Sequence, residues 1–495
     1  MALKHSHTDY TKPARATVAG RIPNMNYSRK PFSLFGPTIA IDIYLAVELF
    51  AIMGIGLLVA SIYVGGYLDA TNYHVDYFYP TLIVTVVFGY LMNRAGQYKV
   101  PSLCRSTHSF SAVMSSLLIA FAAVIVIGFA ARIANEFSRV WLFGWFGSSL
   151  LAIIVLRVIA GRIFNHLSAT GVIRRNVAIY GQGKIADSLA WDLRHAHPGL
   201  RLVGRFHPAG DTQSGKSADV FGDLEDLVAF GQTQPLDSVV LALPALSKDE
   251  LQHILKTLAV LPAEIQLYPS FAGDMVPLRG MTSYDHLRLL DLQRKPMSDW
   301  GVLAKRIEDI IVAGTALVVF APLMALCAAA IKLDSTGPVF FRQRRHGYNN
   351  NVFSVWKFRT MSVMEDGEDV VQASRGDSRV TRVGRWLRRT SLDELPQLFN
   401  VLAGDMSIVG PRPHPLVLKS NYSGLLTYYA NRHRVKPGIT GWAQIHGYRG
   451  PTETPDLMER RVKFDMEYIE NWSLWLDVKI IAATPFLGFF SRNAL

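Results

Sequence analysis

The chain has 495 residues, of which 50% are hydrophobic, and a formal net charge of +12. This length predicts two or three domains, and the mean hydropathy of +0.19 indicates that part of the chain lies in a lipid bilayer. The basic residues flank apolar segments and no nucleic-acid-binding module is visible, so we expect a membrane rather than DNA or RNA as the partner. With only 2 cysteines, a disulfide or zinc site is not expected.

The N-terminal third of the chain predicts a membrane anchor. Residues 1–38 form a polar, basic segment without the pattern of a cleavable signal peptide, and we expect this segment in the cytoplasm. About four apolar runs follow within residues 39–165, and we compare each with the ~20 residues that a helix needs to cross a bilayer. These runs are Ile39–Tyr67, Tyr79–Asn93, Ser111–Ala131 and Val140–Leu156.

The charges between these runs predict their orientation. The first loop carries Asp69 and Asp76, whereas Arg94 and Lys99 follow the second run and Arg157 follows the fourth. By the positive-inside rule, both ends of this multi-pass segment face the cytoplasm. Because the runs contain few ionisable residues, we interpret them as an anchor or oligomerisation module rather than a transport path.

Residues 176–292 predict a Rossmann-like domain. A buried strand at Val177–Tyr180 precedes Gly181, Gly183 and Ala186, whose spacing matches the G-x-G-x-x-A turn of dinucleotide-binding folds. The motif by itself is a weak indication of a cofactor, since it has many false positives. Further strands are predicted at Arg201–Phe206, Ser238–Ala242 and Ile265–Tyr268.

The second predicted strand argues against a working NAD(P) site. A dinucleotide-binding fold places an acidic residue at the end of this strand, where it contacts the ribose. Here Arg201 and Arg205 occupy that region instead. We therefore favour a regulatory or scaffolding domain, while a nucleotide bound as a regulatory ligand remains an open alternative.

The apolar run at residues 305–333 predicts a re-entrant helix. Lys305 and Arg306 precede its core and Lys332 follows it, so both ends prefer the cytoplasm. Pro322 lies in the middle of the run, where it removes a backbone donor and breaks or bends a helix. We favour a helix–break–helix that enters the membrane and returns, because a straight span would leave the basic C-terminal segment outside the cell.

The C-terminal part, residues 300–495, contains the strongest chemical signal. Asp393 and Glu394 are adjacent carboxylates between Arg388 and a Gly/Pro-rich loop that presents Arg412. Arginine binds phosphate oxygens in pairs, and two carboxylates can bind a divalent cation or supply a nucleophile. This combination predicts phosphate chemistry beside a membrane.

Two more cations, Lys357 and Arg359, lie next to apolar side chains and are further candidates for phosphate contacts. Each of them could instead be solvated or face lipid. The carboxylate pair at Asp393 could also cap a helix and complement its dipole, a role that is compatible with catalysis.

Together, these motifs resemble the bacterial sugar transferase family of polyprenyl-phosphate hexose-1-phosphate transferases. The resemblance covers about Arg294 to Leu495 and includes the glycine-punctuated segment Lys436–Gln444. The membrane segment and the Rossmann-like middle domain resemble the large members that start exopolysaccharide synthesis. The implied fold is an α plus α/β membrane protein with a four-helix transmembrane bundle, a Rossmann-like domain and a mostly helical monotopic catalytic domain.

The resemblance implies transfer of hexose-1-phosphate, with glucose-1-phosphate leading and UDP-galactose as the alternative donor. The acceptor would be undecaprenyl phosphate, the released product UMP and the cofactor Mg²⁺. Asp393 matches the family's nucleophile, Glu394 its Mg²⁺ ligand and Pro322 its re-entrant break. Phosphate and nucleotide contacts would come from Lys357, Arg359, Arg388 and Arg412. Membrane lipids, a homodimer and downstream glycosyltransferases are the expected partners.

Two other functions remain as rivals. A nucleotide-sugar epimerase or dehydratase would use the turn at Gly181–Ala186, but the middle domain shows no Tyr-x-x-x-Lys pair on a helix. A non-enzymatic scaffold of an export complex would leave the carboxylate pair and its cations without a role.

Overall fold

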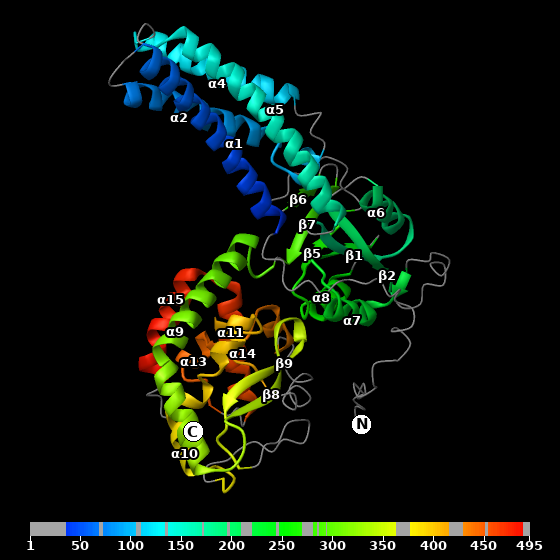
Figure 1. The fold of residues 1–495 in the computed structure, drawn as a ribbon. Helices are drawn as coiled ribbons and strands as arrows, with labels where there is room; N and C mark the ends of the chain where they lie inside the picture. The colour runs from blue at the N-terminus through cyan, green and yellow to red at the C-terminus, as the bar shows by residue number, and fades with distance from the viewer. Residues whose placement is uncertain are drawn as a thin grey trace.

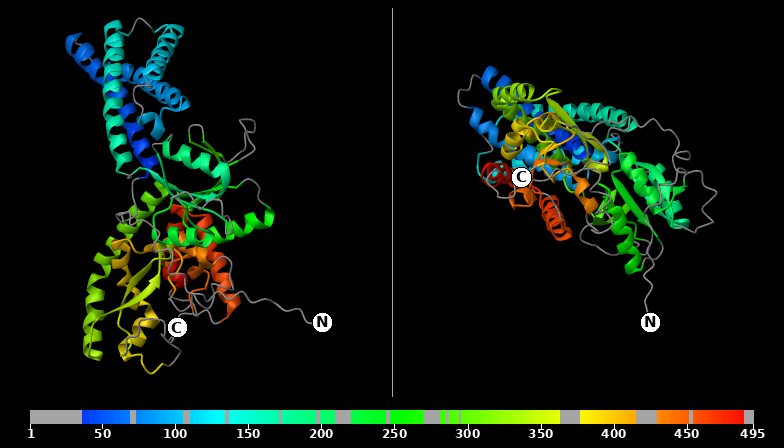
Figure 2. Two further views of the ribbon diagram at one scale, coloured as in Figure 1. Left: turned by 90° about the vertical axis from the view of Figure 1, so that its right-hand side faces the viewer. Right: turned by 90° about the horizontal axis from the view of Figure 1, so that it is seen from below.

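The computed structural model has three parts: a cluster of apolar helices, a middle domain built on a sheet, and a C-terminal domain (Figure 1). The helix cluster and the C-terminal domain lie at opposite ends of the molecule (Figure 2). Of the predicted basic segment 1–38, only residues 36–38 belong to the described part. The structure describes residues 36–68, 73–104, 110–133, 137–170, 173–195, 199–208, 220–243, 247–269, 281–284, 287–293, 295–362, 377–414, 429–450 and 454–488.

Four long apolar helices make up the helix cluster and contain the apolar runs predicted from the sequence. Together with α9 of the C-terminal domain, they are the five described helices that are long and apolar enough to cross a membrane. The indoles of Trp141 and Trp145 donate to the carbonyls of Gly56 and Ile52, each at 2.9 Å, and so tie the last helix to the first. The helices are α1 (Pro37–Val59, continued as a π-helix to Tyr67), α2 (Tyr73–Arg94), the short α3 (Val100–Cys104), α4 (Phe110–Ala130) and α5 (Arg139–Ala169).

A charged pair lies inside this cluster, which the sequence analysis did not anticipate. Glu48 of α1 and Arg157 of α5 are both buried, and Arg157 Nε lies 2.9 Å from Glu48 Oε1. The hydroxyls of Tyr44 and Tyr98 also donate to this carboxylate, at 3.1 and 2.7 Å. Because the buried charge is paired and hydrogen-bonded, the contact fixes α1, α5 and the segment after α2 relative to one another.

The middle domain is a seven-stranded sheet in the order β3-β2-β1-β4-β5-β7-β6. The first five strands in this order are parallel and follow the Rossmann arrangement, whereas β7 and β6 are antiparallel. Helices α7 and α8 cover one face and α6 covers the other. The elements are β1 (Arg175–Gly181), α6 (Gly183–His195), β2 (Leu200–Phe206), β3 (Val220–Gly222), α7 (Leu224–Thr233), β4 (Ser238–Ala242), α8 (Lys248–Leu258), β5 (Glu264–Leu267), β6 (Met281–Tyr284) and β7 (Leu287–Gln293).

The two glycines of the predicted nucleotide turn have structural reasons of their own. Gly181 ends β1 so close to β4 that an added Cβ would collide with the carbonyl oxygen of Ala242. Gly183 begins α6 with a φ of 70°, a conformation that favours glycine. Near the end of the second strand, Arg205 pairs with Asp187 of α6 at 2.7 Å. Backbone packing and conformation therefore account for both glycines. Near the end of the second strand, where a dinucleotide-binding fold has an acidic ribose ligand, this chain has Arg205, and Arg205 is already paired with Asp187.

The C-terminal domain packs one very long helix, α9, against short helices, a hairpin and a pair of parallel strands (Figure 1). Its core joins Ala313 of α9 to Val355, Val401 and Ile480. The elements are α9 (Asp299–Asp334), β8 (Phe340–His346), β9 (Val352–Phe358), α10 (Arg382–Thr390), α11 (Gln397–Ala403), β10 (Ser407–Val409), β11 (Gly438–Thr440), α13 (Trp442–Ile445), α14 (Pro455–Glu470) and α15 (Leu474–Ala483), with 3₁₀ turns at Tyr348–Asn350, Leu392–Glu394 and Tyr429–Arg434 and a π-helical turn at Thr484–Gly488.

Helix α9 continues through Pro322, so the structure does not contain the two separate helices that the sequence predicted. A proline removes one backbone donor, but the rest of the helical ladder remains. Packing supports the helix just beyond this point, because Met324 and Cys327 are buried against Phe358 and Leu387. The re-entrant path through a membrane stays a prediction.

Both ends of α9 are nevertheless bonded to the same domain. Near its start, Arg306 donates to the carbonyls of Val401 and Leu402, each at 2.7 Å. At its far end, the carboxylate of Asp334 accepts a hydrogen bond of 3.1 Å from the backbone N–H of Val383. The two ends of this apolar helix are therefore held by one folded body.

Breaking the charged pair of the helix cluster should destabilise it. In Arg157→Leu, the buried Glu48 carboxylate loses its partner guanidinium. We expect the free energy of unfolding to fall by about 3–5 kcal/mol, which would be measured as a lower Tm of the detergent-solubilised protein. The matched control is Arg162→Leu on the exposed side of α5, which should leave Tm nearly unchanged. Equal melting temperatures for the two variants would contradict a stabilising role for the pair.

Candidate active site

The carboxylate pair lies in a tight turn between two helices. Helix α10 ends at Ser391, whose left-handed conformation (φ 56°) redirects the chain into the 3₁₀ turn Leu392–Glu394. Leu392 and Leu395 flank the pair and pack into the core around α9. As a result, Asp393 and Glu394 are held almost entirely inside the protein, with exposures of 8% and 7%.

Three cationic side chains surround the carboxylate of Glu394. Lys357 Nζ lies 2.9 Å from Oε1, and Arg412 binds both oxygens, at 2.6 and 3.2 Å. Arg449 approaches Oε2 at 3.2 Å. These cations come from β9 and from two different loops, so the site exists only when three separate segments are folded together.

Burial and charge act differently on the two carboxyls. Burial raises the pKa of Asp393 to about 6; nearby Lys357 lowers it and the charge of Glu394 adds to the rise. Burial also opposes ionisation of Glu394, but Arg412 and Lys357 hold its pKa well below its usual range. Glu394 is thus a fixed anion with three cations bonded to it. Within the described residues, Asp393 has no such bonded cation.

The two remaining predicted cations, Arg388 and Arg359, differ in what they contact. Arg388 of α10 donates to the Thr360 hydroxyl at 2.9 Å and is close enough to lower the pKa of Asp393. Arg359 is different, because its guanidinium is buried and donates to the carbonyls of Ser335 and Thr336, each at 2.7 Å. Arg359 therefore clamps the segment after α9, and its contacts give no support to the predicted phosphate role.

Arg449 is the site residue that the sequence analysis missed. It stands between Gly447 and Gly450, and Gly447 adopts a φ of 88°. This arrangement is similar to the glycine- and proline-flanked Arg412 that the analysis did select. A short glycine-bounded loop presenting an arginine was therefore the available signal.

The loop that carries Arg412 is fixed by strand pairing. β10 and β11 are parallel, and Gly410 donates to the carbonyl of Thr440 at 2.9 Å while Gly438 donates to that of Pro411 at 3.0 Å. An added Cβ at Gly410 would press against the backbone of the segment before β11. Close approach of two backbones thus explains the glycines, and the rigid loop limits where the arginine can point.

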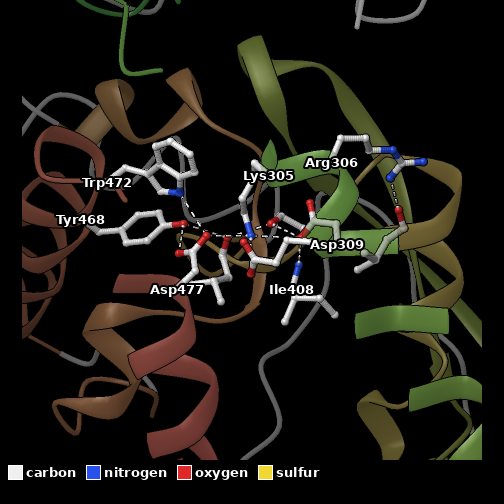
Figure 3. A network of polar contacts seen from close by, with 11 residues as sticks. Lys305, Arg306, Asp309, Ile408, Tyr468, Trp472 and Asp477 are labelled. Atoms are coloured by element: carbon white, nitrogen blue, oxygen red, sulfur yellow. Dashed lines mark hydrogen bonds and ion pairs between the residues drawn. The ribbon is translucent and has the colours of Figure 1, made fainter. Parts of the chain in front are cut away.

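A buried polar network joins this loop to α9 (Figure 3). Asp309 accepts hydrogen bonds from the Ser407 hydroxyl at 2.8 Å and from the backbone N–H of Ile408 at 2.9 Å. Lys305 bridges Asp309, at 3.0 Å, and Asp477 of α15, at 2.9 Å. The network couples the position of the apolar helix to the loop that leads into the site.

The network also binds the C-terminal helices. The hydroxyl of Tyr468 and the indole of Trp472 donate to Asp477 at 2.9 and 3.0 Å. Figure 3 shows Tyr468 and Trp472 converging on the Asp477 carboxylate, which in turn faces Lys305. Lys305 therefore joins α9 to α15 directly, and Tyr468 of α14 enters the network through Asp477.

The donors at the site suit Mg²⁺ in chemical type. Mg²⁺ is commonly held by one or two carboxylates together with substrate phosphates and water, and neither here nor elsewhere do the described residues form a cluster of three or more His, Cys, Asp or Glu ligands. Glu394 is the carboxylate that would hold the ion. Its two oxygens already accept contacts from Lys357, Arg412 and Arg449, the groups that a phosphate-bearing substrate would attract.

Comparison with known proteins identifies the family. Residues 300–491 match the model described as bacterial sugar transferase, and residues 93–269 match one described as a CoA-binding domain. A protein of Escherichia coli K12 named UDP-glucose:undecaprenyl-phosphate glucose-1-phosphate transferase is 37% identical over 424 residues, which is 83% of this chain and 89% of that protein. The chain belongs to the bacterial sugar transferase family.

Two further relatives of this sugar transferase have related names. A protein of Xanthomonas campestris pv. campestris with the same name as the first is 35% identical over 462 residues, 90% of this chain and 93% of that protein. An undecaprenyl-phosphate glucose phosphotransferase of Komagataeibacter xylinus is 42% identical over 356 residues, 71% of this chain and 66% of that protein. The match to the first two includes the helix cluster and the middle domain as well as the site.

Arg359 and Arg412 should respond differently to substitution by lysine. Arg359→Lys cannot donate to two carbonyls in the same fork geometry, so we expect a lower Tm and nearly unchanged activity per folded molecule. Arg412→Lys loses its two-point contact in the site, and we expect kcat/KM to fall on the order of tenfold to hundredfold. The measurement is sugar transferase activity beside thermal unfolding; a reversed pattern would show that the phosphate contact belongs to Arg359.

Proposed function

We propose that this transferase moves glucose-1-phosphate from UDP-glucose to undecaprenyl phosphate and releases UMP. The observation that carries the proposal is the buried pair Asp393–Glu394 with Lys357, Arg412 and Arg449 around it. Such a cluster suits the pyrophosphate of a sugar nucleotide, because its cations can pass from Glu394 to phosphate oxygens. The names of the relatives that align over most of the chain point to the same reaction.

The chemistry divides one displacement into two. Asp393 attacks the β-phosphorus of UDP-glucose, forms an acyl-phosphate bond to glucose-1-phosphate, and the bond to UMP breaks. The phosphate oxygen of undecaprenyl phosphate then attacks the same phosphorus and releases the Asp393 carboxylate. A soluble donor and a lipid acceptor can thereby use one site in turn.

Each side chain has a defined part in this scheme. Asp393, with a pKa of about 6, is ionised at neutral pH, as a nucleophile must be. Lys357, Arg412 and Arg449 neutralise phosphate charge, and Arg388 lies near the nucleophile. Bound Mg²⁺ would supply charge neutralisation for the departing UMP.

The membrane arrangement follows from the apolar helices. We propose that the chain lies in the bacterial inner membrane with its catalytic domain in the cytoplasm, where UDP-glucose is available. The attachment of both ends of α9 to one domain supports a helix that stays on the cytoplasmic side of the bilayer rather than one that crosses it. A re-entrant path that turns at Pro322 is part of this proposal, although α9 is continuous at that residue. The product would start an exopolysaccharide extended by downstream glycosyltransferases, and a homodimer is compatible with the anchor.

The alternatives to this proposal concern the sugar donor, the function of the middle domain and whether the protein is an enzyme. UDP-galactose is the alternative donor, since it differs from UDP-glucose at one hydroxyl. An epimerase or dehydratase acting through Gly181 and Gly183 is disfavoured, because packing accounts for both glycines and Arg205 is paired with Asp187. A scaffold without activity would need no more cations than neutralise the two carboxylates, yet three contact Glu394 alone.

The decisive experiment reconstitutes the reaction with purified protein in nanodiscs. UDP-glucose, undecaprenyl phosphate and Mg²⁺ are supplied, and both UMP and lipid-linked glucose are measured. We expect both products in wild type, none in Asp393→Asn, and none with EDTA. The control Asp405→Asn, at an exposed carboxylate between α11 and β10, should retain activity.

The same material separates the possible outcomes. Without acceptor, labelled sugar phosphate should remain on wild-type protein and be absent from Asp393→Asn. Turnover that survives in Asp393→Asn would refute the covalent intermediate while leaving transfer intact. Turnover with UDP-galactose but not with UDP-glucose would identify UDP-galactose as the donor. Failure with every UDP-sugar would favour a non-enzymatic scaffold.

A further inference from the structure

A second layer of arginines lies behind the site and contacts backbone rather than substrate. Arg432 donates from Nη2 to the carbonyl oxygen of Arg412 at 2.8 Å. Arg461 of α14 donates from Nη2 to the carbonyl oxygen of Gly450, the residue after Arg449. Each of the two loops that bring an arginine to Glu394 is thus held from behind by a buried guanidinium.

One carboxylate organises this layer. Arg432 forms an ion pair of 2.8 Å with Asp465, and the two side chains are 2% and 3% exposed. Asp465 and Arg461 lie four residues apart on α14, so both face the same side of that helix. Burial of two like-charged arginines so close together requires a compensating anion, and Asp465 is the anion whose ion pair provides it.

A neutral histidine fills the space between the two arginines. His414 is buried, and its pKa lies well below its usual range because of burial and the charges of Arg432 and Arg461. Its Nδ1 lies 2.6 Å from Nη1 of Arg432, and its Nε2 lies 3.2 Å from Nη1 of Arg461. Tyr429 contacts the same ring at 2.8 Å. The layer is therefore a closed packing unit that holds both guanidiniums in place.

We propose that Arg432, Arg461 and Asp465 are positioning residues for the transfer reaction, through the loops that carry Arg412 and Arg449. The inference rests on the proposed function and adds residues that never touch substrate. The physical reason is that site geometry must hold to within about 0.5 Å, and a guanidinium bound to a loop carbonyl fixes the neighbouring side chain. A misplacement of about 1 Å can cost on the order of a hundredfold in rate.

Two adjacent arginines on α14 provide a matched test. Arg461 is buried against Gly450, whereas Arg460 is exposed on the same helix. We expect Arg461→Gln to lower kcat/KM on the order of tenfold to hundredfold and Arg460→Gln to change it by less than about twofold. Equal activities of the two variants, per folded molecule, would overturn the proposal.

A double-mutant cycle separates positioning from general stability. If Arg461 acts through Arg449, then Arg461→Gln should cost little further activity once Arg449→Ala is present. Additive losses would mean that Arg461 acts elsewhere and would overturn the proposal. Should Arg461→Gln fail to fold, Arg432→Lys takes its place, paired with Arg412→Ala, because lysine keeps the charge for Asp465 but cannot also reach the Arg412 carbonyl as a fork.

Hydrogen exchange distinguishes this inference from the proposed function. Backbone exchange at residues 447–450 should rise in Arg461→Gln and stay at the wild-type level in Arg460→Gln. If wild type releases no UMP from any UDP-sugar, the proposed function fails, and the exchange result still decides whether Arg461 holds the loop. Unchanged exchange in an active Arg461→Gln would reject the positioning role alone.

Discussion

The structure of the C-terminal domain depends on compensation of the charge on Glu394. A carboxylate that is almost completely buried costs several kcal/mol unless cations meet it, and here three cations do so. They arrive from β9, from the loop after β10 and from the loop after α13, which no short-range structure would bring together. The electrostatic requirement of one side chain thus helps to define the tertiary fold around it. In the part of the chain that the structure describes, the adjacent Asp393 has no such ion pair, which agrees with the nucleophilic role proposed for it.

The polar layers behind the site extend the same logic outward. Arg412 contacts Glu394, Arg432 contacts the backbone of Arg412, and Asp465 compensates Arg432. On the other side, Asp309 accepts a hydrogen bond from the backbone N–H of Ile408 in β10, and Lys305 joins Asp309 to Asp477. In both layers the charged side chains meet groups of opposite charge or backbone N–H and carbonyl groups, which lowers the cost of burying them. The membrane-associated helix and the chemical site are therefore parts of one continuous polar framework.

Much of this organisation was predictable from local sequence. Strands β1, β2, β4 and β5 lie where alternating and β-branched residues placed them, and the apolar runs lie on α1, α2, α4 and α5. Asp393, Glu394, Lys357 and Arg412 meet as expected, because dense polar motifs in a short segment carry their own context. The strands β6 and β7 were not anticipated.

The contacts that the sequence did not reveal have a common physical origin, since they join residues far apart in the sequence. Only the fold shows that the Arg359 guanidinium meets the segment after α9 and that Arg449 meets Glu394. The Glu48–Arg157 pair was invisible because each residue looks like an isolated charge until two helices pack. At Pro322, neighbouring side chains maintain a helix that propensity alone would interrupt. Composition and spacing report local preference, and these contacts belong to the tertiary structure.

The bonds of α9 at both ends also bear on how the protein is made. A ribosome delivers this apolar helix before it has synthesised Val401, Ser407 or Asp477, which are its polar partners. During that interval Lys305 and Asp309 can satisfy each other across one helical turn, because they are four residues apart. The nascent helix can thus remain near the membrane surface with its charges paired locally. Completion of α15 then adds Asp477 as a second partner of Lys305 and joins α9 to α15.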